Sequence, residues 1–594
     1  MQWNDLVLAW SKVEGTSLRN EKTIILSQVW QQTTPPEARV LCYLLASRVA
    51  PLYEPIEIGM AEKSLLRVVS WVARKTLAEV TQEYKRVGDI GEVIFRYLNV
   101  STDLHTSLSI IQVYEQLYLL AMMNGAGSQE GKVVALGKLL LAVSPLGAKY
   151  VMRLVQGKLR LGLLDMTVID ALSWAVKGSK QDRLMLEQAY NVSSDLGMVA
   201  EKYLTDPTQL TSWKVTPGVP VRPMRAERLG TLSEIMEKLG ECAVEPKLDG
   251  MRVQIHAFDL SMIKTNVKTT NLQASLLEDE QELVQIRVFS RGLENITTMF
   301  PEIVGAAKEL YQKIGAFVLD GEAIGVANDG SFLPFQETMT RKRKYGIDEQ
   351  STSTPLQVVV FDVLYAKGSD CLHSDYVTRR DILAKMIAGG KREVLVLAKS
   401  EQVTSATKMQ QLFDEAMSLG LEGILVKKLD SEYRAGARDF AWVKYKRAHE
   451  TELADTIDAV VMGAYVGKGK RNKFGVGAFL VGVQQGEKVV TVAKIGTGLT
   501  DEQFGELFQK VQSSKSEEKN AQYDVPTTLY PDIWVNPSIV VEIEADEITE
   551  SPLHTAGYAL RFPRLLRFRI DKNVADITTQ EEIKKLFEIG RSRL

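Results

Sequence analysis

The residues with the clearest chemical potential lie in one short stretch, residues 245–252, which reads Glu-Pro-Lys-Leu-Asp-Gly-Met-Arg. Apolar residues alternate on both sides of it, which predicts a strand, a tight turn at Gly250 and a second strand. Lys247 then stands at the mouth of a sheet, where its amine could act as a nucleophile. Because the usual lysine pKa of roughly 10.4 leaves this amine charged at neutral pH, burial or neighbouring cations such as Arg252 must lower the pKa before it can react.

Carboxylates recur at the ends of two further apolar segments. Residues 315–322 form a core-strand pattern that ends in Asp320 and Glu322, and residues 421–427 repeat this arrangement with Glu422. Acids at the open end of a core strand are well placed to hold Mg²⁺, because this hard cation prefers oxygen ligands.

The segment 442–446, Trp-Val-Lys-Tyr-Lys, alternates with a period of two. This spacing places Lys444 and Lys446 on the same face of a strand. Two ammonium groups on one face repel each other unless an anion lies between them, and a triphosphate is such an anion. The same positive field would help to lower the pKa of Lys247.

Each of these patterns also has an ordinary explanation. A Lys-x-Asp-Gly sequence occurs by chance in surface hairpins. Arg291, which follows the strand pattern of residues 286–290, could be a turn arginine, and Phe361, within the β-branched run of residues 356–364, could be a core side chain. From these residues alone, the ordinary and the functional interpretations both stay open.

The composition is that of a globular protein with several domains. The chain has 594 residues, of which 45% are hydrophobic and 25% are charged, and this length predicts about two to four domains. It contains no long apolar run and no secretory pattern at its start, which predicts a soluble, cytoplasmic protein. The cysteines Cys42, Cys242 and Cys371 lie far apart, which argues against a disulfide framework and against a structural zinc site.

The charge distribution points in two directions. The formal net charge of -3 argues against simple phosphate binding, because a nucleic-acid surface must be basic. Basic residues are nevertheless concentrated in residues 341–344, 468–473 and 561–572. Each segment alone is more often a solvated face, but all three together, after the Lys247 stretch and in an acidic chain, favour a DNA partner.

The hydrophobic patterns divide the chain into three predicted domains. Residues 1–215 show helical spacing and predict an all-α domain. Residues 215–223 contain three prolines, which predict an extended and mobile linker. Residues 216–447 alternate strands with helices and predict an α+β domain. Residues 448–594 carry short strands between Gly-rich or charged turns, which indicate a small β-barrel, the OB-fold.

Six motifs stand in order over residues 247–446. They are Lys-x-Asp-Gly at 247–250, Ser-Arg-Gly at 290–292, Asp-Gly-Glu at 320–322, Phe-Asp at 361–362, Glu-Gly-x-x-x-Lys at 422–427 and Trp-x-Lys-x-Lys at 442–446. This set resembles the covalent nucleotidyltransferases, the superfamily of ATP-dependent DNA ligases, RNA ligases and mRNA capping enzymes. Residues 148–162 resemble the helical DNA-binding domain of replicative ligases, and residues 559–572 resemble the last ligase motif. The resemblance covers essentially the whole chain and is to an ATP-dependent DNA ligase of the replicative archaeal and eukaryotic type.

The resemblance implies a role for each motif residue. Lys247 would carry AMP as a phosphoramide, Glu245 would accept a hydrogen bond from the exocyclic amine of adenine, and Phe361 would stack on the base. Arg561 and Lys572 would orient the leaving pyrophosphate. The other implied nucleotide-binding residues are Arg252, Arg291, Glu322, Lys427, Lys444 and Lys446, and the implied metal ligands are Glu322 and Glu422.

In the N-terminal domain the resemblance implies contacts to duplex DNA. Unpaired amides at Gly127 and Ser128 suit phosphate oxygens, because a helix N-terminus offers free N–H groups. The basic side chains expected at the phosphate backbone are Lys149, Arg153, Lys158 and Arg160.

The implied reaction seals a nick between a DNA 5′-phosphate and a 3′-hydroxyl, in replication, repair and recombination. Its cofactors are ATP and Mg²⁺, with Mn²⁺ as a substitute, and its partner is nicked double-stranded DNA. A monomer is expected, and a sliding clamp is a partner on family grounds alone.

Several alternatives share parts of this pattern. An mRNA capping guanylyltransferase or an RNA ligase would share the lysine motif, but the helical N-terminal half and the Arg-Phe-Pro-Arg sequence at 561–564 favour a DNA ligase. A non-catalytic relative is expected to have lost Lys247 or the metal carboxylates, which are all present. An NAD-dependent ligase is disfavoured by the lack of a four-cysteine zinc site. None of the five histidines lies in the six motifs, so a histidine-based hydrolase is disfavoured as well.

Overall fold

The computed structural model consists of two compact units, Met1–Tyr445 and Lys446–Leu594. It describes residues 1–99, 107–125, 127–211, 213–264, 283–327, 330–333, 335–339, 341, 354–388, 394–446, 456–467 and 474–592. Of the predicted basic segments, residues 342–344 and 468–473 lie outside the described residues. No helix in the ranges described is long and apolar enough to cross a membrane.

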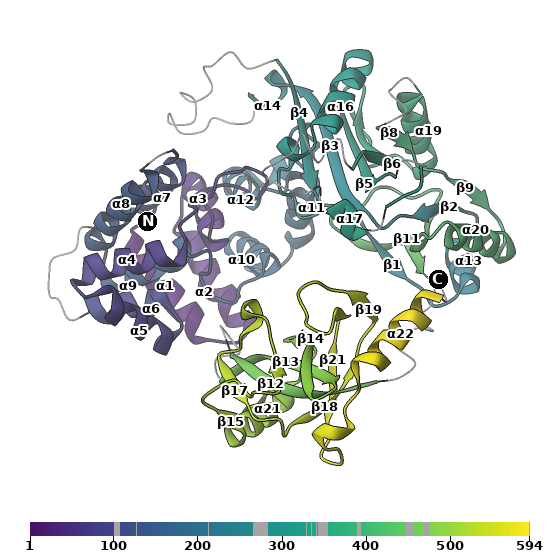
Figure 1. Ribbon diagram of the computed structural model, residues 1–594. Helices are drawn as coiled ribbons and strands as arrows, with labels where there is room; N and C mark the ends of the chain where they lie inside the picture. The colour runs from purple at the N-terminus through teal and green to yellow at the C-terminus, as the bar shows by residue number, and fades with distance from the viewer. Residues whose placement is uncertain are drawn as a thin grey trace. The chain divides into compact units, whose positions relative to one another are not determined.

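The first part of the larger unit is helical, as the sequence predicts (Figure 1). Its helices are α1 (Trp3–Gly15), α2 (Arg19–Gln31), α3 (Pro35–Leu45), α4 (Glu62–Ala73), α5 (Leu77–Val87), α6 (Ile90–Leu98), α7 (Ile110–Met122), α8 (Ser128–Ala142), α9 (Pro145–Val155), α10 (Asp165–Lys177), α11 (Arg183–Ser193) and α12 (Leu196–Thr205), followed by the 3-10 turn η1 (Pro207–Leu210). Thr76 and Ser109 start α5 and α7 with capping boxes, which satisfy the free amides of the first turn. Trp3, Trp10 and Tyr150 pack edge to face in the core, with ring centroids 5.6 and 5.5 Å apart.

Two sheets follow in the larger unit. The strands are β1 (Arg225–Arg228), β2 (Cys242–Lys247), β3 (Met251–Asp259), β4 (Val284–Ser290), β5 (Phe317–Gly325), β6 (Leu356–Ala366), β7 (Ser369–Asp370), β8 (Leu395–Leu397), β9 (Glu401–Val403), β10 (Gly423–Lys428) and β11 (Arg438–Lys446). The β3 sheet has the order β4-β3-β5-β6-β7, with β8 paired to β6. The β2 sheet has the order β1-β11-β10-β2-β9.

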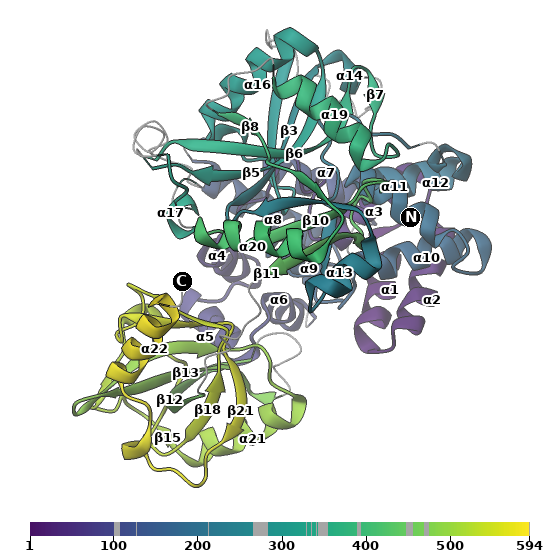
Figure 2. The ribbon, with the colours of Figure 1, turned by 90° about the vertical axis from the view of Figure 1, so that its right-hand side faces the viewer.

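The helices and 3-10 turn of this region are α13 (Leu232–Leu239), α14 (Ser261–Lys264), η2 (Thr297–Met299), α16 (Pro301–Ile314), α17 (Phe335–Met339), α19 (Tyr376–Ile387) and α20 (Ala406–Ser418). Four of these helices cover the sheets (Figure 2). α16 and α19 pack on the β3 sheet in a core that contains Leu383, and α13 and α20 pack on the β2 sheet in a core that contains Met409. The inner faces of the two sheets meet through a third core, to which Val318 and Trp442 belong.

The predicted strand, turn and strand at residues 245–252 are present, but the two strands do not pair with each other. β2 pairs with β9 and β10, whereas β3 pairs with β4 and β5. The chain crosses from one sheet to the other beside Gly250, where an added Cβ would lie 2.5 Å from the carbonyl oxygen of Ala323. Glycine is required there by this close approach. Lys247 therefore lies where the two sheets meet and not in a surface hairpin.

The sequence predicts an extended proline-rich segment before β1, but this segment contains a turn in which the Val219 N–H donates to the Thr216 carbonyl at 3.0 Å, and it is bound along β3. Gln254 accepts a hydrogen bond from the Val221 N–H at 2.8 Å and donates one to the Val221 carbonyl at 3.1 Å. His256 Nδ1 accepts a bond from the Gly218 N–H at 2.9 Å. Because buried backbone groups need partners, these polar side chains fix a segment that the sequence suggested would be mobile.

The smaller unit is rich in sheet. Its elements are β12 (Ile457–Val466), β13 (Val476–Gln485), β14 (Lys488–Ile495), α21 (Asp501–Ser513), β15 (Lys515–Ser516), β16 (Tyr523–Asp524), η4 (Thr527–Leu529), β17 (Ile533–Val535), β18 (Val540–Glu544), β19 (Glu547–Glu550), β20 (Tyr558–Arg561), β21 (Arg564–Phe568), η5 (Val574–Asp576) and α22 (Gln580–Ser592). β12 pairs with β13, β17 and β18, and β18 pairs with β21. The strands described here do not close into a barrel, so the β character of the region agrees with the prediction while barrel closure is not observed.

Candidate active site

Lys247 ends β2 and lies opposite Gly423 of β10. The backbone N–H of Glu422 donates to the Lys247 carbonyl at 3.1 Å, which brings the Glu422 side chain next to the lysine. The Lys247 Nζ forms an ion pair with the Glu422 carboxylate, and the two side chains are 25% and 23% exposed. The pair is therefore open enough for a substrate to reach the amine.

The surroundings of Lys247 lower its pKa below the usual value of a lysine. Burial lowers the pKa of Lys247 and the Arg291 guanidinium lowers it further, while Glu322 and Asp249 act in the opposite direction. The sequence suggested Arg252 as the nearby cation. Arg291 has this effect instead, because Arg252 is bound to a carboxylate of its own.

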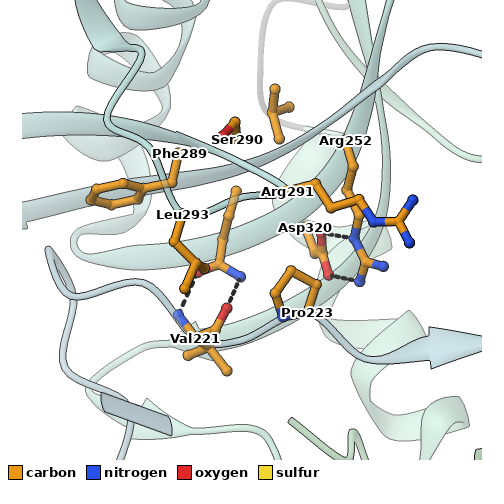
Figure 3. A pocket seen from close by; sticks show the side chains of 10 residues that line it. Val221, Pro223, Arg252, Phe289, Ser290, Arg291, Leu293 and Asp320 are labelled. Atoms are coloured by element: carbon orange, nitrogen blue, oxygen red, sulfur yellow. Dashed lines mark hydrogen bonds and ion pairs between the residues drawn. The ribbon is translucent and has the colours of Figure 1, made fainter. Parts of the chain in front are cut away.

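Arg252 and Asp320 form a bidentate pair across β3 and β5 (Figure 3). The Arg252 Nε and Nη2 donate to Asp320 at 3.1 and 2.7 Å, and its Nη1 donates to the Met224 carbonyl at 2.7 Å. The Tyr433 hydroxyl donates to the same carboxylate at 2.7 Å. Arg291 extends beside this pair, from the turn after β4, at a small pocket that all three of Arg252, Asp320 and Arg291 help to line. Because Asp320 is paired with Arg252, Glu322 is the acid of β5 that can bind a metal cation.

Glu322 lies opposite Arg252 in the register of β5 and β3. Burial raises the pKa of Glu322 to about 7, although Arg252 and Lys247 oppose the rise. A buried carboxylate of this kind is stabilised by an added cation. Glu322 and Glu422 both face Lys247 and offer the oxygen ligands that Mg²⁺ prefers, so these residues fit this ion. Among the described residues no group of three or more His, Cys, Asp or Glu side chains is arranged to hold a metal; water and substrate oxygens would complete the coordination.

The inner end of the site is built around Glu245, which is 2% exposed. The Lys427 Nζ lies 2.8 Å from Glu245 Oε2, and the Tyr376 hydroxyl donates to Oε1 at 2.7 Å. The ammonium of Lys427 is 4.9 Å from the ring centroid of Phe361 and 4.4 Å from that of Trp442. The expected base-binding residues Glu245 and Phe361 therefore come together. Lys427, which the resemblance makes a ligand of the nucleotide phosphates, is instead held by Glu245 and lies near the rings of Phe361 and Trp442.

Lys444 and Lys446 lie on β11, with the alternation that the sequence predicts. Burial lowers the pKa of Lys444, and the positive charge of Lys247 lowers it further. An anion between these two amines would relieve their repulsion. Lys446 is the first residue of the smaller unit.

Two predicted residues of the last motif lie wholly within the smaller unit. Arg561, on β20, has its guanidinium 4.0 Å from Glu547 and 5.5 Å from the ring centroid of Phe562. The Lys572 Nζ lies 2.6 Å from the Asp458 carboxylate. Both cations are partly exposed.

In the helical region, some of the predicted DNA-binding residues lie at the surface. Lys158 is exposed. Arg160 has a φ of 63° and donates to the Gly88 carbonyl at 2.8 Å. Gly127 is exposed with a φ of 80° and precedes Ser128, the first residue of α8. The prediction of an unpaired amide is wrong for Ser128, whose N–H donates to the Gly125 carbonyl at 3.2 Å.

Arg153 and Lys149 are placed differently. Arg153 is 3% exposed, with its Nη1 2.9 Å from Glu14 and its Nη2 2.6 Å from Asp89. Lys149 lies 3.4 Å from Glu14 and 3.2 Å from Glu92. Arg153 therefore joins helices in the interior and cannot offer its guanidinium to a phosphate. The sequence could not separate it from Lys158, because both are basic residues of the stretch 148–162 that resembles the DNA-binding domain.

Two tyrosines of the site were not predicted. Tyr376 begins α19 and Tyr433 precedes β11, and each donates to a carboxylate of the site. Neither stands in one of the six motifs, so the sequence carried no signal for them.

A partly exposed lysine at the junction of two sheets, with carboxylates around it and a buried glutamate two residues away, is the arrangement expected of a nucleotidyltransferase. Three family models match the chain: DNA ligase N terminus over residues 3–173, ATP dependent DNA ligase domain over 279–446 and ATP dependent DNA ligase C terminal region over 472–572. The chain belongs to the family of ATP-dependent DNA ligases.

Individual relatives agree with this assignment over the full length. A probable DNA ligase of Dictyoglomus turgidum is 40% identical over 99% of this chain and 97% of its own length. A DNA ligase of Nitrosopumilus maritimus is 34% identical over 99% of this chain and 98% of its own length. The solved structure titled Pmar-Lig_PreS3 has a TM-score of 0.54 at 16% identity, over 95% of this chain and 99% of that one, and this likeness concerns the fold.

Proposed function

We propose that this DNA ligase seals nicks in duplex DNA through an AMP adduct on Lys247. The amine attacks the α-phosphate of ATP, so that a P–N bond forms, the bond to the β-phosphate breaks and pyrophosphate leaves with loss of a proton from the amine. The observation that carries the proposal is the accessible Lys247 amine beside Glu422, with a pKa lowered by burial and by Arg291. Such an amine is the activated nucleophile that covalent catalysis needs.

Two further transfers complete the reaction. An oxygen of the DNA 5′-phosphate takes AMP from Lys247, which regains its proton. The 3′-hydroxyl then attacks the 5′-phosphorus, the new phosphodiester forms and AMP leaves. These steps depend on in-line positioning and charge neutralisation more than on acid–base catalysis, which agrees with a site made of lysines, arginines and carboxylates.

The candidate site residues divide by role in this proposal. Arg291, Lys444 and Lys446 neutralise the phosphates, with Arg561 of the smaller unit acting on the pyrophosphate. Glu245 and Phe361 bind the base, and Arg252, held by Asp320, is a further nucleotide-binding residue. Glu322 and Glu422 would hold Mg²⁺, which supplies charge neutralisation at the phosphate oxygens.

The DNA-binding surface that we propose lies in the helical region. It contains Gly127, Ser128, Lys158 and Arg160, with Lys149 at its edge, and Arg153 supports it from inside. We further propose domain limits of 1–215, 216–447 and 448–594, with an OB-fold in the last domain. The sliding clamp, the monomeric state and the roles in replication, repair and recombination stay predictions.

The experiment that tests the proposal is transfer of label from α-³²P ATP. The protein is first treated with pyrophosphate to remove bound AMP, then incubated with labelled ATP and Mg²⁺ and separated on a denaturing gel. The wild type is expected to form a labelled band that disappears when nicked DNA is added, whereas Lys247→Ala forms none. Lys428→Ala, on an exposed lysine of neighbouring β10, is the matched control and retains the band.

Two results would contradict the proposal. A wild-type protein that takes no label after pyrophosphate treatment is not a ligase of this mechanism. A protein that takes label from GTP and not from ATP, or passes it to RNA alone, belongs with the capping enzymes or RNA ligases in activity.

A further inference from the structure

The carboxylate of Glu245 is held from two sides by groups that come from different elements. The Tyr376 hydroxyl, at the start of α19, donates to Oε1 at 2.7 Å, and the Lys427 ammonium, on β10, lies 2.8 Å from Oε2. The Tyr376 hydroxyl is also 2.9 Å from the Ser400 hydroxyl. With one protein donor on each oxygen, the carboxylate has a fixed plane.

Tyr376 is itself fixed. Its ring is 2% exposed, and the ring centroid lies 5.2 Å from the Lys427 Nζ. The preceding Asp375 caps the helix by accepting the Thr378 N–H at 2.7 Å. Burial and the neighbouring Glu245 raise the pKa of Tyr376, so its hydroxyl keeps its proton and remains a donor.

This arrangement decides what Glu245 can bind. A carboxylate only accepts hydrogen bonds, and each oxygen has about two lone-pair positions. One position on each oxygen is taken by Tyr376 or Lys427, and the free positions point in directions that these two donors set. Adenine presents an amine donor at C6, where guanine presents a carbonyl acceptor. A rigid acceptor therefore favours adenine, and a mobile carboxylate would favour it less.

We propose that Tyr376 is a specificity-determining positioning residue, which orients Glu245 toward the exocyclic amine of the adenine base. This inference rests on the proposed function, since it requires ATP at the Lys247 site. Tyr376 does not touch the reacting atoms, and its effect is confined to the distinction between purines with and without a 6-amine.

The test compares ATP with purine riboside 5′-triphosphate, which lacks the 6-amine, as substrates for labelling of the protein with AMP or its analogue. Wild-type protein is expected to prefer ATP in kcat/KM. In Tyr376→Phe the preference falls about 10-fold, the size expected when a hydrogen bond to a charged group loses its geometry. The lower preference comes from a lower kcat/KM with ATP, mainly through a higher KM. The kcat/KM with the amine-free nucleotide stays nearly unchanged.

The matched control is Tyr203→Phe, which removes a hydroxyl that donates to Asp182 at 2.8 Å in the helical region. It leaves the ratio of the two substrates unchanged. A purely structural role for Tyr376 would lower both rates equally, and that outcome overturns the inference. Tyr376→Leu also lacks the donor and gives the same lowered preference if the phenylalanine variant folds poorly. Absence of labelling in the wild type contradicts the proposed function, whereas a wild type that labels and a Tyr376→Phe variant with an unchanged ratio contradict only the role of Tyr376.

Discussion

Two lysine–glutamate pairs link β2 with β10 and with Glu422, the residue directly before β10, and they differ chiefly in exposure. Lys247 with Glu422 is 25% and 23% exposed, whereas Lys427 with Glu245 is 0% and 3% exposed. The same pair chemistry therefore serves two purposes. The half-open pair leaves an amine that a substrate can reach, and the closed pair leaves a carboxylate that is fixed in place.

The difference follows from the strand geometry. Glu245 and Lys247 are two residues apart on β2 and share one face. Lys247 is at the end of the strand, where the chain leaves the sheet, while Glu245 lies inside, opposite Leu425 of β10. One strand thus carries the reactive group at its end and the recognition group within the core.

The largest effect is expected at the open pair. Lys247→Met removes the nucleophile, so labelling with AMP should fall by at least about 10⁴-fold, since no other group replaces it. The free energy of unfolding should change by only about 1 kcal/mol, because partly exposed ion pairs contribute little to stability. Gel labelling and urea unfolding measure the two quantities. If Lys247→Met is unfolded without urea, the Lys247–Glu422 pair is needed for stability, and the difference between the open and the closed pair no longer holds.

The closed pair should respond in the opposite way. Lys427→Met leaves Glu245 buried without its cation, and removing one partner of a buried pair costs about 3–5 kcal/mol. Urea unfolding of Lys427→Met beside Lys247→Met measures the difference directly. If the two variants are equally stable, exposure does not distinguish the pairs.

Glu322 permits a test through pH. Its pKa is raised from 4.5 to about 7 in the folded protein, so between these values the folded protein holds a proton that the unfolded chain has lost. The Glu322 contribution therefore lowers the free energy of unfolding as pH rises through this window, by up to about 1.4 kcal/mol per pH unit. Without metal, Glu322→Gln should be less sensitive to pH than the wild type between pH 4.5 and pH 7. Added Mg²⁺ should reduce this fall in the free energy of unfolding in the wild type and not in Glu322→Gln. Equal pH dependence of the two proteins would contradict the raised pKa of Glu322.

The contrast between open and closed cations extends to the helical region, where the expected effects are smallest. Lys158→Ala should weaken binding to nicked DNA slightly and reduce the salt dependence of binding by about one counterion, with stability unchanged. Arg153→Met should instead lower stability, because Glu14 and Asp89 lose the nearest of their cationic partners. Titration with fluorescent DNA at several salt concentrations measures the first effect, and a Lys158 variant with an unaltered salt slope would remove this residue from the interface.

The sequence predicted the residues of the open pair better than their arrangement. Lys247 ends β2 and Glu422 directly precedes β10, near the ends of apolar segments as predicted. The prediction that the strand of residues 315–322 ends in its carboxylates is wrong, because β5 continues to Gly325 and Asp320 and Glu322 lie within it. The pairing of Lys247 with Glu422 joins residues 175 positions apart, and a local pattern cannot show that β2 and β3 belong to different sheets.

Partners that lie far along the chain account for the remaining differences. Arg252 is bound to Asp320, and Arg153 is buried between Glu14 and Asp89, so each basic residue resembles a ligand-binding cation until its carboxylate partner is known. Tyr376 donates to Glu245 across 131 positions. Neither burial nor such a distant partner is encoded in the residue type alone.

The most direct test of the difference between the two pairs is to locate the AMP adduct by mass spectrometry of peptides after reaction with ATP and Mg²⁺. The account predicts AMP on Lys247 and none on Lys427, although both amines lie beside a glutamate on the same sheet. An adduct on Lys427, or on any lysine other than Lys247, would contradict it.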